Sequence, residues 1–206
     1  MSKLRCHISM SLDGFVAGPN QSEENPLGEG GEGLHDWVVP LAAWRRMHGK
    51  PGGEVNESTR VFEESIENIG AGVMGRNMFG PIGGGAWGDD PPYHHPVFIL
   101  THHPRDPVKM EGGTTFHFVT DGIESALDQA REPAGGKDVM LWGGGQVAQQ
   151  YLAAGLLDEL ELHVVPVVLG DGARLYDNLG DAEVRLEQVR AVEAPGVTHL
   201  KYRSVK

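Results

Sequence analysis

Cysteine is almost absent from this chain of 206 residues, in which Cys6 is the single example. One thiol cannot form a disulfide within the chain, so the cysteine usage does not indicate an oxidising compartment. Uninterrupted apolar runs of about 18 residues are also lacking, as is the apolar core of a secretory signal peptide near the N-terminus. We therefore expect a cytoplasmic protein that does not span a membrane.

Basic residues are few, because 17 Lys and Arg stand against 29 Asp and Glu and give a formal net charge of −12. Such a surface repels the phosphates of nucleic acids and the headgroups of anionic membranes. The charge therefore predicts that neither nucleic acid nor membrane is a main partner. It still allows one local basic pocket for a single phosphate.

Several catalytic signatures are missing. The sequence has no H-E-x-x-H helix and no cysteine cluster, and two of its histidine pairs (94–95 and 102–103) are adjacent, so their side chains point to opposite faces of a strand. We therefore expect no metal site. There is also no G-x-S-x-G elbow and no G-x-x-x-x-G-K-[ST] loop, which argues against hydrolases and P-loop kinases.

Glycine, in contrast, is abundant, with 30 residues that gather mainly at positions 28–33, 83–85 and 143–145. Glycine clusters are typical of turns, mobile loops and places where the backbone approaches a ligand. Residues 21–33 are acidic as well as glycine-rich and follow the first expected strand. We predict that they form a mobile loop that acts as a lid.

The apolar pattern alternates between strands and helices. It predicts strands at residues 4–10, 71–75, 97–101, 114–120, 138–142 and 158–169, and helices at residues 34–48, 56–68, 123–131 and 146–154. Two alternating segments, 183–193 and 197–205, flank a turn and predict a hairpin. The expected fold is a single α/β domain over residues 1–206. Its mostly parallel sheet has about eight strands and an antiparallel C-terminal hairpin.

Polar or glycine-rich residues follow three of these strands, at Gly75-Arg76-Asn77, Thr101-His102-His103 and Gly143-Gly144-Gly145. Ligands of open α/β sheets bind beyond the carboxyl ends of the strands, and helix N-termini favour anions. The three ends together therefore indicate a phosphate-containing ligand. The alternatives are a tight strand–helix turn without a ligand at 143–145 and a surface ion pair for Arg76.

Five segments, in this order, resemble the dihydrofolate-reductase-like superfamily: SLDGFVAG at 11–18, VMGRNMF at 73–79, FILTH at 98–102, WGGG at 142–145 and DELELHVVPVVLG at 158–170. They are most similar to the C-terminal reductase domain of bifunctional riboflavin-biosynthesis deaminase-reductases. The resemblance covers nearly the whole chain. It implies a three-layer dihydrofolate-reductase-like fold, and the zinc-ligand pattern of the deaminase half is not found in these 206 residues.

The resemblance also implies NADPH as the cofactor, and it assigns cofactor-binding roles to Gly75, Arg76, Asn77, Thr101, His102, His103, Gly143, Gly144, Gly145, Gln146 and Val147. Arg76, Thr101 and the imidazoles favour NADP over NAD, because a phosphate monoester is recognised by cations and hydrogen-bond donors. The substrate side is assigned to Ser11, Trp37, Leu169 and Gly170.

The proton donor is ambiguous in this sequence. Asp36, which follows the glycine-rich loop, is the first candidate and Glu57 is the second, although an acid in a first helical turn is often a cap or a dipole partner. We interpret Asp13 as a turn-forming residue. Trp142, beside the triple glycine, is interpreted as a core residue.

We therefore hypothesise an NADPH-dependent reductase, with a small-molecule substrate, that transfers a hydride to a carbonyl or imine carbon. The resemblance suggests a ribosylaminopyrimidine as the substrate class, and it suggests a homodimer. The alternatives are a non-catalytic module that binds NADPH or another nucleotide, and a broad reductase of flavins or quinones.

Overall fold

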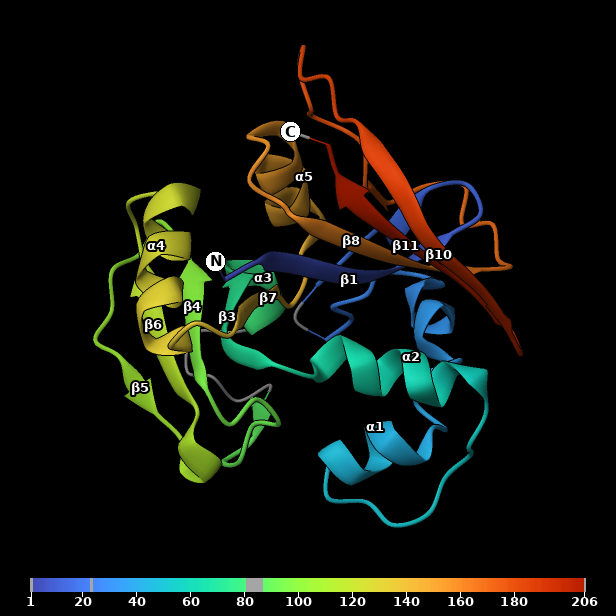
Figure 1. Cartoon of the computed structure of the whole chain (residues 1–206), viewed down its shortest axis with the longest axis horizontal. Coiled ribbons are helices and arrows are strands. Elements are labelled where there is room, and N and C mark those ends of the chain that lie inside the picture. The colour runs from blue at the N-terminus through green and yellow to red at the C-terminus, as the bar shows by residue number, and fades with distance from the viewer. Residues whose placement is uncertain (1, 23, 81–86, 206) are drawn as a thin grey trace.

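The computed structural model describes residues 2–22, 24–80 and 87–205. A nine-stranded sheet, in the order β10-β11-β8-β1-β7-β3-β4-β6-β5, runs through the molecule (Figure 1). Strands β8, β1, β7, β3, β4 and β6 are parallel, whereas β11, β10 and β5 are antiparallel to their neighbours. The α/β class, the mostly parallel sheet and the terminal hairpin are thereby confirmed.

The strands of this sheet are β1 (Leu4–Ser11), β3 (Ile69–Gly75), β4 (Pro96–Leu100), β5 (Val108–Lys109), β6 (Thr115–Val119), β7 (Asp138–Leu141), β8 (Glu159–Val165), β10 (Leu186–Ala194) and β11 (Val197–Ser204). A separate pair joins β2 (Phe15–Ala17) to β9 (Ala173–Arg174). The ninth strand of the large sheet, beyond the expected eight or so, is the two-residue β5.

Helices lie on both faces of the sheet (Figure 1). On one face, α4 (Ile123–Ala134) and α5 (Gly145–Ala153) enclose the largest apolar core. The other face carries η1 (Gly31–His35), α1 (Ala42–Met47), α2 (Glu57–Ile66) and α3 (Arg76–Phe79), and η3 (Glu111–Gly113) lies near β6. The two layers of helices reflect the alternation of side chains along the strands. In β1, Leu4 and Cys6 face the α4–α5 core, whereas Arg5 and His7 face the opposite way.

The expected helix over residues 34–48 is wrong in its first half. The regular helix begins only at Ala42, after Pro40, and η1 ends at His35. A proline lacks the N–H that an interior helical position needs, so it separates the two short elements. The expected strand over 158–169 likewise ends at Val165, directly before Pro166, whereas the helix over 56–68 is confirmed as α2, with Asn56 as its N-cap.

The glycine-rich loop 21–33 packs against the segment that precedes it. Gly18 N donates to Leu27 O at 2.8 Å and Glu29 N donates to Pro19 O at 2.9 Å. A side chain on Gly18 would clash with Glu29 O, because a Cβ there would lie 1.9 Å from that atom. The mobility of the loop stays a prediction, and the cluster at 83–85 lies outside the described residues.

Candidate active site

Three neighbouring strands bring the predicted cofactor residues to one edge of the sheet. In the parallel register Val73 of β3 pairs with Leu141 of β7, and Gly75 pairs with Leu100 of β4. The segments that follow, 143–145, 76–77 and 101–103, therefore emerge side by side. The prediction that they share an edge is confirmed, whereas their binding role stays a prediction.

The backbone is tightly packed where β7 passes into α5. Gly143 and Gly144 have φ angles of +132° and +97°, which residues with side chains rarely adopt. A Cβ on Gly75 would lie 2.8 Å from Val147 Cγ2, so this glycine lets β3 approach α5 closely. Val147 N and Ala148 N both donate to Gly144 O at 3.0 Å. The N–H groups of Gly145 and Gln146 come before them and point out of the N-terminus of α5, as the first N–H groups of a helix do. This bare turn fits the pyrophosphate of a dinucleotide.

The side chains at the neighbouring strand ends differ in exposure. Arg76 is half-buried and its guanidinium donates to Gly80 O, whereas Asn77, His102 and His103 are exposed. Thr101 is buried and its Oγ1 accepts a hydrogen bond from His103 N at 3.1 Å. The exposed imidazoles and the arginine can thus meet a phosphate, while Thr101 holds the turn in shape.

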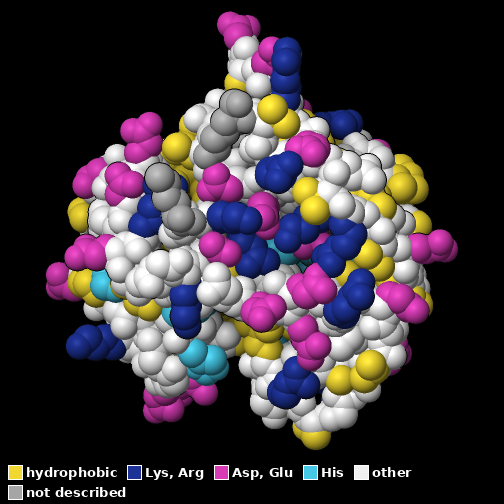
Figure 2. Space-filling view, in the orientation of Figure 1, with side chains coloured by type: hydrophobic (Ala, Val, Ile, Leu, Met, Phe, Trp, Pro, Cys, Tyr) yellow, Lys and Arg dark blue, Asp and Glu magenta, His cyan; other side chains and the backbone are white. Residues whose placement is uncertain are grey.

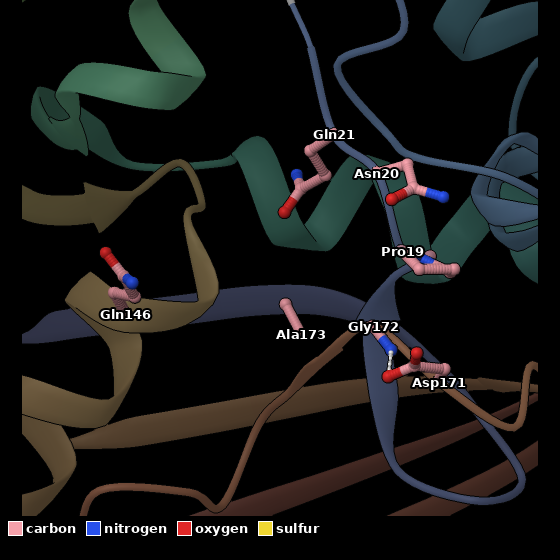
Figure 3. Close-up of a pocket in the computed structure, with 8 residues that line it drawn as sticks. Pro19, Asn20, Gln21, Gln146, Asp171, Gly172 and Ala173 are labelled. Atoms are coloured by element: carbon pink, nitrogen blue, oxygen red, sulfur yellow. Dashed lines mark hydrogen bonds between the residues drawn. The ribbon is translucent and has the colours of Figure 1, made fainter.

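A pocket of about 370 Å³ opens beside the start of α5 (Figure 3). Gln146 lines it from α5, Gln21 from the beginning of the glycine-rich loop, and Asn20 from the residue before that loop. It is lined by Gly18, Pro19, Asn20, Gln21, Gln146, Asp171, Gly172 and Ala173. These described lining residues include no Lys, Arg or His, so this pocket suits an uncharged amide-bearing group better than a phosphate.

Asp13 ties the end of β1 to the predicted substrate edge. Its Oδ1 accepts hydrogen bonds from Ser11 Oγ at 2.6 Å and Leu169 N at 3.1 Å, and its Oδ2 accepts one from Gly170 N at 2.7 Å. These donors, Ser11 first, lower the pKa of Asp13 to about 2. The interpretation of Asp13 as a turn-forming residue is confirmed, and it brings three predicted substrate residues together.

The two predicted proton donors face solvent. Asp36 and Glu57 are both exposed, whereas the next residue in each case, Trp37 or Ser58, is buried. The Trp37 indole donates from Nε1 to Ser9 Oγ at 3.0 Å and lies against His163, with ring centroids 4.5 Å apart. The catalytic role of either acid therefore stays a prediction without a supporting contact.

Sequence reasoning missed His163 and His199, which lie buried beside Trp37. A signal was available, since Glu159, Glu161 and His163 alternate with leucines along an expected buried strand. The interpretation of Trp142 as a core residue agrees with the structure, because its ring packs over Gly72 and against Tyr93 and His95.

The described residues also bear on two other classes of site. Within them, no group of three or more His, Cys, Asp or Glu side chains is arranged to hold a metal ion. No helix in the described part of the chain is long and apolar enough to cross a membrane.

The fold belongs to the dihydrofolate-reductase-like class. The solved dihydrofolate reductase of Enterococcus faecalis, complexed with NADP(H) and RAB-propyl, matches with a TM-score of 0.56 and 15% identity. The match covers 99% of this chain and 97% of that one.

The family model described as the RibD C-terminal domain matches residues 2–200, and the chain belongs to this family. A solved protein of Shewanella sp. PV-4, named for riboflavin biosynthesis, is 21% identical with a TM-score of 0.69 and 99% coverage of both chains. The diaminohydroxyphosphoribosylaminopyrimidine deaminase/5-amino-6-(5-phosphoribosylamino)uracil reductase of Thermotoga maritima has a TM-score of 0.61 and 13% identity. That match covers 99% of this chain but 57% of the Thermotoga chain. The Bacillus subtilis (strain 168) protein named "Uncharacterized protein YyaP" is 25% identical over 179 residues, or 82% of this chain and 77% of that protein.

Proposed function

We propose that this protein is an NADPH-dependent reductase that transfers a hydride to a carbonyl or imine carbon of a small polar heterocycle of the ribosylaminopyrimidine type. The observation that carries the proposal is the glycine-built turn between β7 and α5, beside Arg76 at the end of β3 and the imidazoles at the end of β4. Membership of the RibD C-terminal domain family supports the substrate class.

Different residues at the ends of β3, β4 and β7 would bind different groups of NADPH. Gly143, Gly144 and Gly145, with the first N–H groups of α5, would hold the pyrophosphate. Arg76, His102 and His103 would hold the 2′-phosphate, since a guanidinium fork matches phosphate oxygens. The pocket beside Gln146, which is lined by Asp171 but by no described cation, would take the carboxamide end. When bound, NADPH supplies the hydride.

The remaining residues of the site position groups and exclude water. Asp13 holds Leu169 and Gly170 against the end of β1. Gly30 in the glycine-rich loop lies over the same edge, because a Cβ there would be 3.2 Å from Leu169 Cδ2. A loop in this place can shield the reacting atoms from solvent while the backbone below keeps its shape.

A non-catalytic nucleotide-binding module is the second candidate, and the exposure of Asp36 and Glu57 favours it. Such a module would bind NADPH without oxidising it. A broad flavin or quinone reductase would instead oxidise NADPH with several unrelated acceptors.

The first test compares the affinities of NADPH and NADH for the wild type and Arg76→Ala by fluorescence titration. Loss of one phosphate-pairing arginine should cost about 1.5–3 kcal/mol, and the loss should fall on NADPH. Arg131→Ala is the matched control, because Arg131 pairs with Asp128 on the exposed side of α4. Failure of both cofactors to bind at high micromolar concentration would contradict the proposal.

The second test is turnover. NADPH oxidation is followed with 5-amino-6-(5-phosphoribosylamino)uracil, and then with free flavin and a quinone. Oxidation with the first compound alone supports the proposed reductase. Oxidation with all three supports the broad reductase, and binding without oxidation supports the nucleotide-binding module.

We also propose that two copies pair as a homodimer through β10. This strand ends the order of the large sheet, and its Val189 side chain is exposed. An open strand edge can pair with a second copy. Light scattering should show a dimer that Val189→Arg weakens, and a monomeric wild type would contradict the pairing.

A further inference from the structure

A cluster of polar side chains lies buried beneath η1 and α2, on the face of β1, β8 and β11 that these helices cover. His199 and Ser58 are each 1% exposed and His163 is 5% exposed. We use the name histidine cluster for Ser9, Trp37, Ser58, His163 and His199. Buried polar groups are costly unless they are hydrogen-bonded, so such a cluster in a core needs an explanation.

Three members of the histidine cluster form a continuous chain. Ser58 Oγ lies 2.9 Å from His199 Nε2, and His199 Nδ1 lies 2.8 Å from His163 Nδ1. Of two neutral imidazoles that meet through Nδ1, one must donate and the other must accept. When His199 donates, its Nε2 accepts from the Ser58 hydroxyl and His163 carries its proton on Nε2. The opposite tautomers reverse every hydrogen bond in the chain.

The surroundings keep these imidazoles neutral. Burial, and after it the charge of Arg190 on β10, lowers the pKa of His199 to about 4. Burial also holds the pKa of His163 well below its usual range, and the neighbouring His199 and His35 act in the same direction. Neutral rings have one N–H and one acceptor each, which is what a proton relay requires.

Other titratable groups surround the pair. The ring centroid of His7 on β1 is 5.9 Å from that of His163, and His7 Nδ1 lies 3.4 Å from Glu161 Oε2 without forming a hydrogen bond. His35 of η1 has a buried Nδ1 with no partner among the described residues. Glu161 is paired with Arg190 at 3.0 Å. Side chains of Lys and Arg, mixed with acids, gather over this part of the sheet (Figure 2).

His163, at the end of this chain of hydrogen bonds, lies on the strand β8 that continues to the proposed substrate edge. His163 pairs in register with Ser9, and two residues further Val165 pairs with Ser11, on the same face. At about 3.3 Å per residue, His163 is about 7 Å along the strand from the level of Ser11. Nε2 is the remaining polar atom of His163, and Trp37 lies against this ring.

We propose that His163 donates the proton that completes the reduction, and that His199 and Ser58 are positioning residues that restore it. This rests on the proposed function. As the hydride bonds to the imine carbon, the C=N π pair moves to nitrogen and takes the proton from His163 Nε2. The His199 Nδ1 proton passes to His163 Nδ1, the Ser58 proton passes to His199 Nε2, and water returns a proton to Ser58. Trp37 must shift when the substrate binds.

The variants His163→Gln, His199→Gln and Ser58→Ala test this relay, with His117→Gln as the control. His117 is a partly buried histidine that stacks on Phe98, on the outer strands β6 and β4. NADPH oxidation with 5-amino-6-(5-phosphoribosylamino)uracil is measured from pH 5 to 9, in H₂O and in D₂O. NADPH affinity and thermal unfolding are measured alongside.

We expect kcat to fall by about 100-fold or more in His163→Gln, the size typical of lost acid catalysis, with KM and NADPH affinity almost unchanged. His199→Gln and Ser58→Ala should lower kcat less, and should change the solvent isotope effect. Ser58→Ala keeps the test decisive if a histidine variant does not fold. Wild-type rates and solvent isotope effects in all folded variants would overturn the relay alone. A wild type that binds NADPH without oxidising it would overturn the proposed reductase and the relay together.

Discussion

The two faces of β1 and β8 differ although the same strands build both. On one face Leu4, Cys6, Leu160 and Leu162 pack under α4 and α5 in an apolar core. On the other face Arg5, Glu161 and His163 are ionisable and almost as deeply buried. The first face needs only apolar side chains of the right size, whereas the second needs every polar group placed against a partner. The two faces of one sheet therefore stabilise the fold in different ways.

The largest expected effect lies on the apolar face. Leu160→Ala leaves a cavity in the main core, because Leu160 is fully buried there. It should lower the free energy of unfolding by about 2–5 kcal/mol. Denaturant unfolding measures the change, and Leu12→Ala, at a leucine that is 62% exposed, is the control. Equal losses in both variants would contradict the assignment of the core.

The adjacent residue probes the polar face. Glu161→Gln keeps the volume but removes the charge that pairs with Arg190. We expect a loss of about 1–2 kcal/mol, less than for a fully buried pair, since Arg190 is partly exposed and keeps Glu64. The same denaturant experiment measures it. An unchanged or more stable variant would show that burial of Glu161 costs as much as its pairing contributes.

The polar face should also make stability depend on pH. Burial lowers the pKa values of His7, His163 and His199, so between about pH 6.5 and 4 the unfolded chain binds more protons than the folded one. The contribution of these neutral histidines to the free energy of unfolding is therefore complete above pH 6.5 and is lost as the pH falls toward 4. Burial raises the pKa of Glu161, which opposes the loss, but the histidines are more numerous. The Tm should fall through this window, and His199→Gln should flatten the fall.

The smallest expected effect is a local change of amide exchange at residues 169 and 170, beside Asp13. Asp13→Asn replaces an acceptor-only carboxylate with an amide that cannot accept from Leu169 and Gly170 through both atoms. Amide exchange at residues 169 and 170 should quicken while exchange in the strands stays the same. Asp106→Asn, at an exposed aspartate, is the control. Unchanged exchange at 169 and 170 would show that these amides do not depend on Asp13.

Much of this architecture could be predicted, because short apolar runs and glycine turns carry local signals. Residues 71–75 and 139–142 are apolar, and Arg76 or the triple glycine 143–145 follows them, so their pattern alone places these polar or glycine-rich segments at strand ends. The start of the helix within residues 34–48 could not be predicted from the sequence, because the helical spacing of apolar residues continues through Pro40. In the structure the chain turns there and the helix begins at Ala42. No motif identified the proton donor. Asp36 and Glu57 have the pattern of acids at a helix start whether or not they face a substrate, so the sequence could not decide their role.

The sequence by itself determined the α/β alternation, the parallel edge with its glycine turns and the acidic character of the chain, because these depend on composition and on neighbours within a few residues. Only the tertiary structure decided that Ser58, His163 and His199 meet. They come from α2, β8 and β11, and 141 residues separate Ser58 from His199. Such a contact depends on sheet order and register, which bring distant residues within hydrogen-bond distance. No local pattern encodes that order.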